Sequence, residues 1–355
     1  MSCQTSFRAI LFFILSIAAD CGLRAAAIHD AARKGDVEKV RVLLETDPSS
    51  VNAKDTDVGD TPLLVAVGNR EPDGGKARLD LVKLLLDKGA AIDGKNRWRQ
   101  TPLFVAAENG AIEVVKLLIE KGAAVNADDR VGQTPLHAAA KSGNGEIIKL
   151  LLAGGAAIDA KNHVGETPLF VMAEDGNIEV MKLLIEKGAS LIAKQSEDQT
   201  PLMVAARGGR LGAVKLLLER GAEVNGNDQY GGTPLMFGAF SGNENIVALL
   251  LEKGAAIDAK DPQGNTALSE GAGFGSAKVV KLLLDKGAPV DEKGYLGYTA
   301  LWNAVLNNRV DTLKALLEKR ANPNTQVGKG LTPLHYAELK GFTEITELLR
   351  KAGAR

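Results

Sequence analysis

Aromatic side chains are scarce in this sequence, at 4% of its 355 residues, so any core must be built from aliphatic side chains. Charge of one sign is also lacking: 43 basic and 44 acidic side chains leave a net charge of -1. That balance gives no electrostatic reason to expect a nucleic acid as partner. Both cysteines, Cys3 and Cys21, lie near the amino terminus, which excludes a disulfide framework or a cysteine metal site from the rest of the chain.

A period of 33 residues runs through most of the sequence. A Thr-Pro-Leu or Thr-Ala-Leu triplet begins at Thr101, Thr134, Thr167, Thr200, Thr233, Thr266, Thr299 and Thr332. A repeat of this length indicates stacked units in one elongated array, because one unit cannot bury its own hydrophobic face.

One unit, from Thr134 to Glu166, shows how the repeat folds. Thr134 can cap a helix whose first residue is Pro135, and Gly143 permits the chain to turn. The apolar spacing from Ile147 to Leu152 predicts a second helix, and the polar remainder suits an extended arm with a tight turn. Helices this short depend on stacking against neighbouring units for their stability.

With its TPLH start, the glycine before its second apolar run and a GAxVNA ending, this unit resembles an ankyrin repeat. The resemblance implies an all-α solenoid of about ten stacked helix-turn-helix units with short β-hairpin or turn arms, over residues 22–355. It also implies a structural role for His29, His137 and His335, which share one position in their units. Because they lie in different units, they cannot converge on one metal ion. We expect His163 to be exposed in an arm.

Three units depart from the pattern. The first lacks the Thr-Pro start, and the second is seven residues too long, with the surplus within residues 68–80. The polar segment 69–76 predicts a projecting loop, which either extends a binding face or is a tolerated surface insertion. The ninth has Asn308 and Arg320 where other units have glycine.

The first 20 residues differ in kind from the repeats. Arg8 precedes an apolar run, Ala9 to Ala19, that is short for a membrane span. This pattern favours a signal peptide and a protein exported to the periplasm or secreted. The alternatives are an uncleaved membrane anchor formed by residues 9–19 and a capping helix of a cytosolic array.

The resemblance places a partner on a concave surface formed by the arm tips and the exposed side of the first helices. Tyr, Trp and Arg, which often anchor interfaces, gather at these variable positions. We predict two partner-binding clusters: Arg97, Trp98, Arg99 and Arg130 in the early arms, and Tyr230, Phe240, Phe274, Tyr295 and Tyr298 in the later units. The alternative is ordinary packing, in which Trp302 turns inward at the usual histidine position and Phe240 and Phe274 cover each other.

The leading hypothesis is a non-enzymatic protein–protein interaction scaffold for a protein or peptide partner. We predict no catalytic residues, cofactor, metal, nucleic acid or small-molecule substrate, and membrane contact only through an uncleaved amino-terminal segment. An enzyme or phosphate-binding protein using the glycine-rich turn at 271–276 is the rival, but that turn lacks the spacing of a phosphate loop and no strand leads into it. A membrane-tethered scaffold or a secreted host-directed effector also remains open.

Overall fold

The structure, a computed structural model, describes residues 26–68 and 76–355. It comprises two compact units, unit 1 up to His163 and unit 2 from Val164 onward. The predicted signal segment, residues 1–20, lies outside the described residues, as does the larger part of the predicted insertion, residues 69–75.

Both units are built from helix pairs. In unit 1 the pairs are residues 26–33 with α2 (Val37–Thr46), α3 (Pro62–Gly68) with α4 (Lys76–Asp87), α5 (Pro102–Glu108) with α6 (Ile112–Glu120), and α7 (Pro135–Ser142) with α8 (Gly145–Ala153). A short 3₁₀ helix, η1 (Pro48–Asn52), follows α2.

Unit 2 continues the same pattern. Its pairs are α9 (Pro168–Asp175) with α10 (Ile178–Glu186), α11 (Pro201–Arg207) with α12 (Leu211–Glu219), α13 (Pro234–Ser241) with α14 (Glu244–Glu252), α15 (Ala267–Gly273) with α16 (Ala277–Asp285), α17 (Ala300–Leu306) with α18 (Val310–Glu318), and α19 (Pro333–Lys340) with α20 (Thr343–Lys351). The 3₁₀ helix η2 (Tyr295–Gly297) lies in an arm.

Local sequence explains where these helices begin and end. Thr101 has extended backbone angles and its hydroxyl accepts a hydrogen bond from the Phe104 N–H at 3.3 Å, while Pro102 occupies the first helical position. Helix α7 ends at Gly143, whose φ of 75° lies in the left-handed region that favours glycine. The Thr-Pro start and the glycine turn therefore act as predicted.

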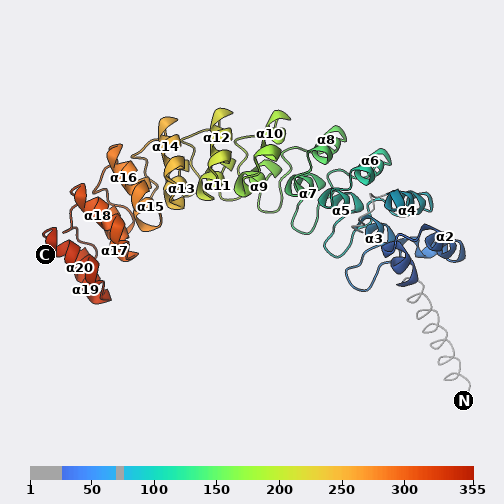
Figure 1. The fold of residues 1–355 in the computed structure, drawn as a ribbon, viewed down its shortest axis with the longest axis horizontal. Helices are drawn as coiled ribbons and strands as arrows, with labels where there is room; N and C mark the ends of the chain where they lie inside the picture. Colours follow the sequence, from blue (N-terminus) through green and yellow to red (C-terminus); the bar gives the residue numbers. More distant parts are fainter. Residues whose placement is uncertain (1–25, 69–75) are drawn as a thin grey trace, which may run out of the picture. The chain divides into compact units, whose positions relative to one another are not determined.

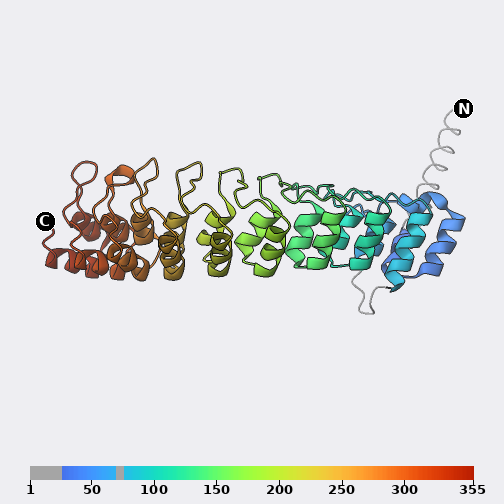
Figure 2. The ribbon, with the colours of Figure 1, turned by 90° about the horizontal axis from the view of Figure 1, so that it is seen from above.

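Stacking supplies the core that a single pair lacks. Within each unit the first helix of a pair packs against the first helix of the next, and the second helices pack likewise. In each unit the helices form two rows, with the arms extending from one side of the helices (Figures 1 and 2). The buried side chains are mainly aliphatic, with Leu103, Leu136 and Ile148 fully enclosed. The all-α stacked fold is confirmed.

The irregular units adapt without losing this pattern. Helix α4 has 12 residues where α6 and α8 have 9, so part of the insertion lengthens the start of a helix. In the ninth pair Asn308 and Arg320 adopt φ values of 53° and 62°, the backbone conformation that glycine has elsewhere. Apart from η2 the described arms consist mainly of turns, and the one β-bridge among the described residues joins Val327 to Leu331.

Candidate interaction surface

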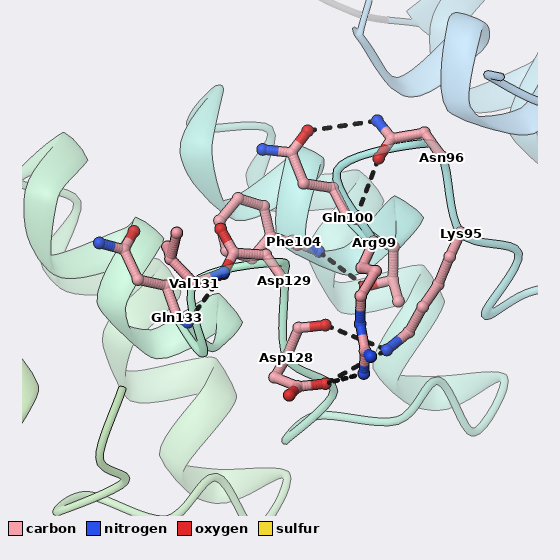
Figure 3. Close-up of polar contacts among 10 residues, drawn as sticks. Lys95, Asn96, Arg99, Gln100, Phe104, Asp128, Asp129, Val131 and Gln133 are labelled. Carbon is pink, nitrogen blue, oxygen red and sulfur yellow. Dashed lines mark hydrogen bonds and ion pairs between the residues drawn. The ribbon is translucent and has the colours of Figure 1, made fainter. Parts of the chain in front are cut away.

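Several arms are closed by one side-chain acceptor at their base. In the arm after α6, the Asp129 carboxylate accepts hydrogen bonds from the backbone N–H groups of Val131 at 2.9 Å and Gln133 at 2.8 Å (Figure 3). Asp228 bonds Tyr230 and Gly232 in the same way. Because the acceptor closes the turn, the residues at the tip are displayed outward.

Neighbouring arms are also joined through their backbones. The N–H of Arg130 donates to the Trp98 carbonyl at 2.8 Å in unit 1, and that of Gln229 donates to the Glu197 carbonyl at 3.0 Å in unit 2. The next such bond is absent, because Pro262 stands at the donor position and has no N–H. The arm that carries Tyr230 therefore lacks this link to the arm that follows.

The early cluster is partly committed to internal contacts. The Arg97 guanidinium donates to the carbonyl oxygens of Thr56 and Asp57 in the preceding arm, and Arg99 pairs with Asp128 at 3.0 Å (Figure 3). No ion pair of Arg130 occurs within the described residues. The Trp98 side chain is 49% exposed. Trp98 and Arg130 are thus the members that remain open to a partner.

Asp128 organises this cluster electrostatically. Its carboxylate contacts both Lys95, at 3.3 Å, and Arg99. Burial on its own would raise the pKa of Asp128, but the hydrogen bonds and charges of these two cations hold it below its usual value. The Asp128 carboxylate therefore stays ionised and holds the Arg99 side chain beside the arm that carries Asp128.

The later aromatic residues divide into separate groups. Phe240 and Phe274 contact each other, with ring centroids 5.2 Å apart, and both are exposed. Tyr298 is half-buried against Trp302, with centroids 5.4 Å apart, and Trp302 is fully buried. Tyr295 is exposed on its arm. Trp302 and the Phe240–Phe274 contact therefore agree with ordinary packing, although both phenylalanine side chains remain exposed.

Tyr230 and Phe240 border an open hollow in unit 2 with a volume of about 360 Å³. Three arms and the helices α11, α13 and α15 contribute to it. Its lining consists of Glu197, Gln199, Arg207, Asp228, Tyr230, Gly232, Met236, Phe237, Phe240, Asp261 and Glu270. Two of the nine predicted partner-binding residues are thereby brought together at one concave place, with polar groups that sequence reasoning did not single out.

Glu270 is the most informative of these missed residues. It occupies the fourth position after the threonine, where Val171, Val204 and Phe237 stand in preceding pairs of unit 2. The side chain is half-buried. Burial raises the pKa of Glu270 above its usual value, and the nearby Asp261 carboxylate raises it further. A carboxylate at a position that is apolar in the preceding pairs of unit 2 was the signal that could have identified it.

The histidines have the predicted character. His29 is buried and its Nε2 lies 2.9 Å from the Asp60 carbonyl oxygen, while Nδ1 of His137 accepts from the Thr134 N–H at 3.2 Å. Nδ1 of His335 lies 3.0 Å from the Thr332 hydroxyl oxygen, and His163 is exposed. Across residues 26–68 and 76–355, no group of three His, Cys, Asp or Glu side chains could hold a metal ion.

The glycine-rich turn has a packing role. A Cβ at Gly275 would collide with the Ala239 carbonyl oxygen, and one at Gly271 would lie 3.2 Å from a Val279 methyl. The glycines thus allow α15 to approach α13 and α16 closely. Within the described part of the chain, no helix is long and apolar enough to cross a membrane.

Comparison with known families and structures supports this architecture. Residues 73–162, 146–228 and 224–294 match a family model described as ankyrin repeats (3 copies), and residues 301–350 match a second described as ankyrin repeats (many copies). The crystal structure of the ankyrin repeat domain of Bcl-3, a member of the IkappaB protein family, is similar with a TM-score of 0.56 and 32% identity. That match covers 64% of this chain and 100% of the Bcl-3 chain.

Curated relatives match over shorter stretches. The serine/threonine-protein kinase VIK of Arabidopsis thaliana is 40% identical over 80 residues, which are 22% of this chain and 16% of the kinase. The E3 ubiquitin-protein ligase XB3 of Oryza sativa subsp. japonica is 34% identical over 88 residues, 24% of this chain and 18% of the ligase. Since the matches span less than a fifth of either relative, they concern repeat units and carry neither enzyme's activity.

Proposed function

The chain belongs to the ankyrin-repeat family, and on that premise we propose that it is a non-enzymatic scaffold that binds a protein or peptide partner against its arms and first helices. We call this surface the arm face. The observation that carries the proposal is the distribution of exposed aromatic side chains. Among the described residues, those that stand out as large and exposed are Trp98, Tyr230, Phe240, Phe274 and Tyr295, and each lies on an arm or at the end of a first helix.

The location of these rings on arms and first-helix ends, and not on second helices, is what favours an interaction surface. Aromatic residues are few in the sequence, and an exposed ring stabilises an isolated repeat little. Rings with a polar atom or a neighbouring cation offer large contact area at low cost in conformational entropy. The exposed Arg130 next to the Trp98 arm, and the hollow beside Tyr230, provide two such places.

The test is capture of a native partner by the immobilised array, with chemical crosslinking and mass spectrometry. The arm-face variant combines Trp98→Ser with Tyr230→Ser. Its matched control combines Val42→Ser with Leu211→Ser, which removes exposed apolar side chains from second helices. We expect capture to fall at least tenfold in the first variant and to persist in the second. Equal capture by both variants would remove the arm face as the binding surface.

We further propose that residues 1–20 direct export of the array. The support is the sequence alone: one basic residue, Arg8, an apolar run from Ala9 to Ala19, and small residues after it. Sequencing the amino terminus of the protein purified from its native cell decides the matter. A mature start beyond Ala18 is expected, whereas an intact Met1 or Ser2 in the soluble fraction would overturn export, and an intact start in the membrane fraction would indicate an anchor.

A further inference from the structure

We propose that the hollow of unit 2 receives a lysine or arginine side chain of the bound partner, held by Glu270 and flanked by aromatic rings. This inference rests on the proposed function and names the chemistry that the arm face recognises there. It follows from three properties of the hollow: its charge, the carboxylate of Glu270, which is half-buried and unpaired among the described residues, and the rings around it.

The charge of the lining favours a cation. Four carboxylates, those of Glu197, Asp228, Asp261 and Glu270, face the hollow with one guanidinium, that of Arg207. Arg207 is already engaged, because its guanidinium lies 3.5 Å from the Glu174 carboxylate outside the lining. An anionic or neutral group would meet uncompensated negative charge, whereas a cation complements it.

The carboxylates are not equivalent. Asp228 and Asp261 each accept two backbone N–H groups and thereby close their own arms. Glu270 differs, since no hydrogen bond or ion pair to its carboxylate is found within the described ranges. A half-buried carboxylate without a partner costs free energy in the unbound protein. A cation that enters the hollow would supply the missing partner and offset that cost.

The position of Glu270 strengthens this argument. The equivalent residues of the two preceding pairs, Val204 and Phe237, are apolar, so the fold does not require a carboxylate at this place. Natural sequences depart from local consistency mainly at functional or strained sites. Glu270 is therefore better explained by what it contacts in a complex than by the stability of the free array.

The rings explain why the cation should be an amino acid side chain. Tyr230, Phe237 and Phe240 line the same hollow as Glu270. Aromatic faces attract ammonium and guanidinium groups, and the methylene stems of lysine and arginine can pack on apolar surface. A bare divalent ion binds oxygen ligands in preference to rings, and within the described residues no group of three His, Cys, Asp or Glu side chains is placed to hold a metal ion. An extended peptide lying across the arms could insert one such side chain.

The experiment uses the full chain and a positional-scanning library of fluorescein-labelled nonapeptides with blocked termini. Peptides that bind are compared with versions in which each lysine or arginine is replaced by glutamine, by fluorescence polarisation. The variants are Glu270→Gln and, as a matched control of the same change in unit 2, Glu252→Gln at the exposed end of α14. Lysine and arginine peptides are measured separately to learn which cation is preferred.

We expect one peptide position to require lysine or arginine, with a loss of about tenfold or more in affinity on change to glutamine. Glu270→Gln should weaken the basic peptide by a similar factor, leave the glutamine peptide unchanged and thereby abolish the preference, while Glu252→Gln should preserve it. Binding without a basic preference, or a preference that Glu270→Gln leaves intact, would overturn this inference and leave the scaffold function standing. Absence of binding by every peptide, together with absence of native partner capture, would overturn both.

Discussion

The indole nitrogen of Trp302 lies 3.1 Å from the backbone carbonyl oxygen of Thr325 and donates a hydrogen bond to it. Trp302 occupies the position at which other repeats have His29, His137 or His335, and it is fully buried. Its N–H reaches the arm that follows its own helix pair, as His29 reaches Asp60. A larger ring therefore takes over the histidine's contact with the next arm while filling more of the core.

Trp302 is accordingly predicted to stabilise the last repeats. Trp302→Phe keeps an aromatic ring but loses the hydrogen bond, and we expect it to cost about 1 to 2 kcal/mol. Trp302→Ala should cost about 3 to 5 kcal/mol because it also leaves a cavity. Urea unfolding followed by circular dichroism measures both changes. Trp98→Phe is the control, and its effect should stay below about 0.5 kcal/mol because that ring is exposed.

We expect a substitution of Thr325, the residue whose carbonyl accepts this bond, to stabilise the protein. Thr325 is buried, and its Oγ1 has no hydrogen-bond partner among the described residues. Thr325→Val replaces the hydroxyl with a methyl group of similar size, so we expect a gain of about 0.5 to 1 kcal/mol. Thr325→Ser retains the hydroxyl and loses the methyl, and it should destabilise. A loss on Thr325→Val would mean that the hydroxyl has a bound partner in solution.

Glu270 should destabilise the free array near neutral pH. Its raised pKa means that the folded protein holds this proton more tightly than the unfolded chain, whose glutamate pKa is about 4.3. Stability therefore falls as pH rises through the interval between the unfolded and the folded pKa. Glu270→Gln should raise the unfolding free energy by about 0.5 to 2 kcal/mol at pH 7, and the gain should shrink toward pH 4.

Chemical denaturation at a series of pH values measures this difference directly. Glu252→Gln, on an exposed helix end, serves as the control and should show no comparable trend. A gain that stayed constant from pH 4 to pH 7 would exclude the carboxylate's ionisation as its cause. If Glu270→Gln both weakens peptide binding and gives a pH-dependent gain in unfolding free energy, then Glu270 contributes to recognition and lowers the stability of the free protein.

Asn225 ties one repeat to the next through both ends of its amide. Its Nδ2 donates to the Gly254 carbonyl at 3.0 Å, and its Oδ1 accepts from the Ala256 N–H at 2.9 Å. Asn225→Ala should lower stability by about 1 to 2 kcal/mol and speed hydrogen exchange of the Ala256 amide.

Asn225→Asp is an informative companion variant. Asp93 and Asp291 accept the corresponding N–H bonds in other repeats, so an aspartate at 225 should keep the Ala256 contact and lose only the one to Gly254. We expect about half the destabilisation of the alanine change and near-normal exchange at Ala256. Equal effects of the two variants would assign the stabilisation to the donor alone.

The repeat pattern predicted the fold more fully than the site. Thr101, Pro102 and Gly143 set local backbone geometry through capping and a left-handed turn, which depend on residues nearby in the sequence. The site depends on side chains about a repeat or more apart in the chain. Nothing local to Arg97 indicated that its guanidinium would bind the carbonyls of Thr56 and Asp57 rather than face solvent.

The sequence by itself determined the architecture, because a 33-residue period of capped, amphipathic helices can bury its apolar faces only by stacking. It also located the unusual residues, Trp98, Tyr230 and Phe240 among them. Only the tertiary structure decided which of them lie together. Stacking brought Tyr230, Phe240 and Glu270, from three consecutive repeats, around one hollow, and it left Tyr298 packed against Trp302. Proximity across repeats depends on how the helices pack, and the period alone does not specify it.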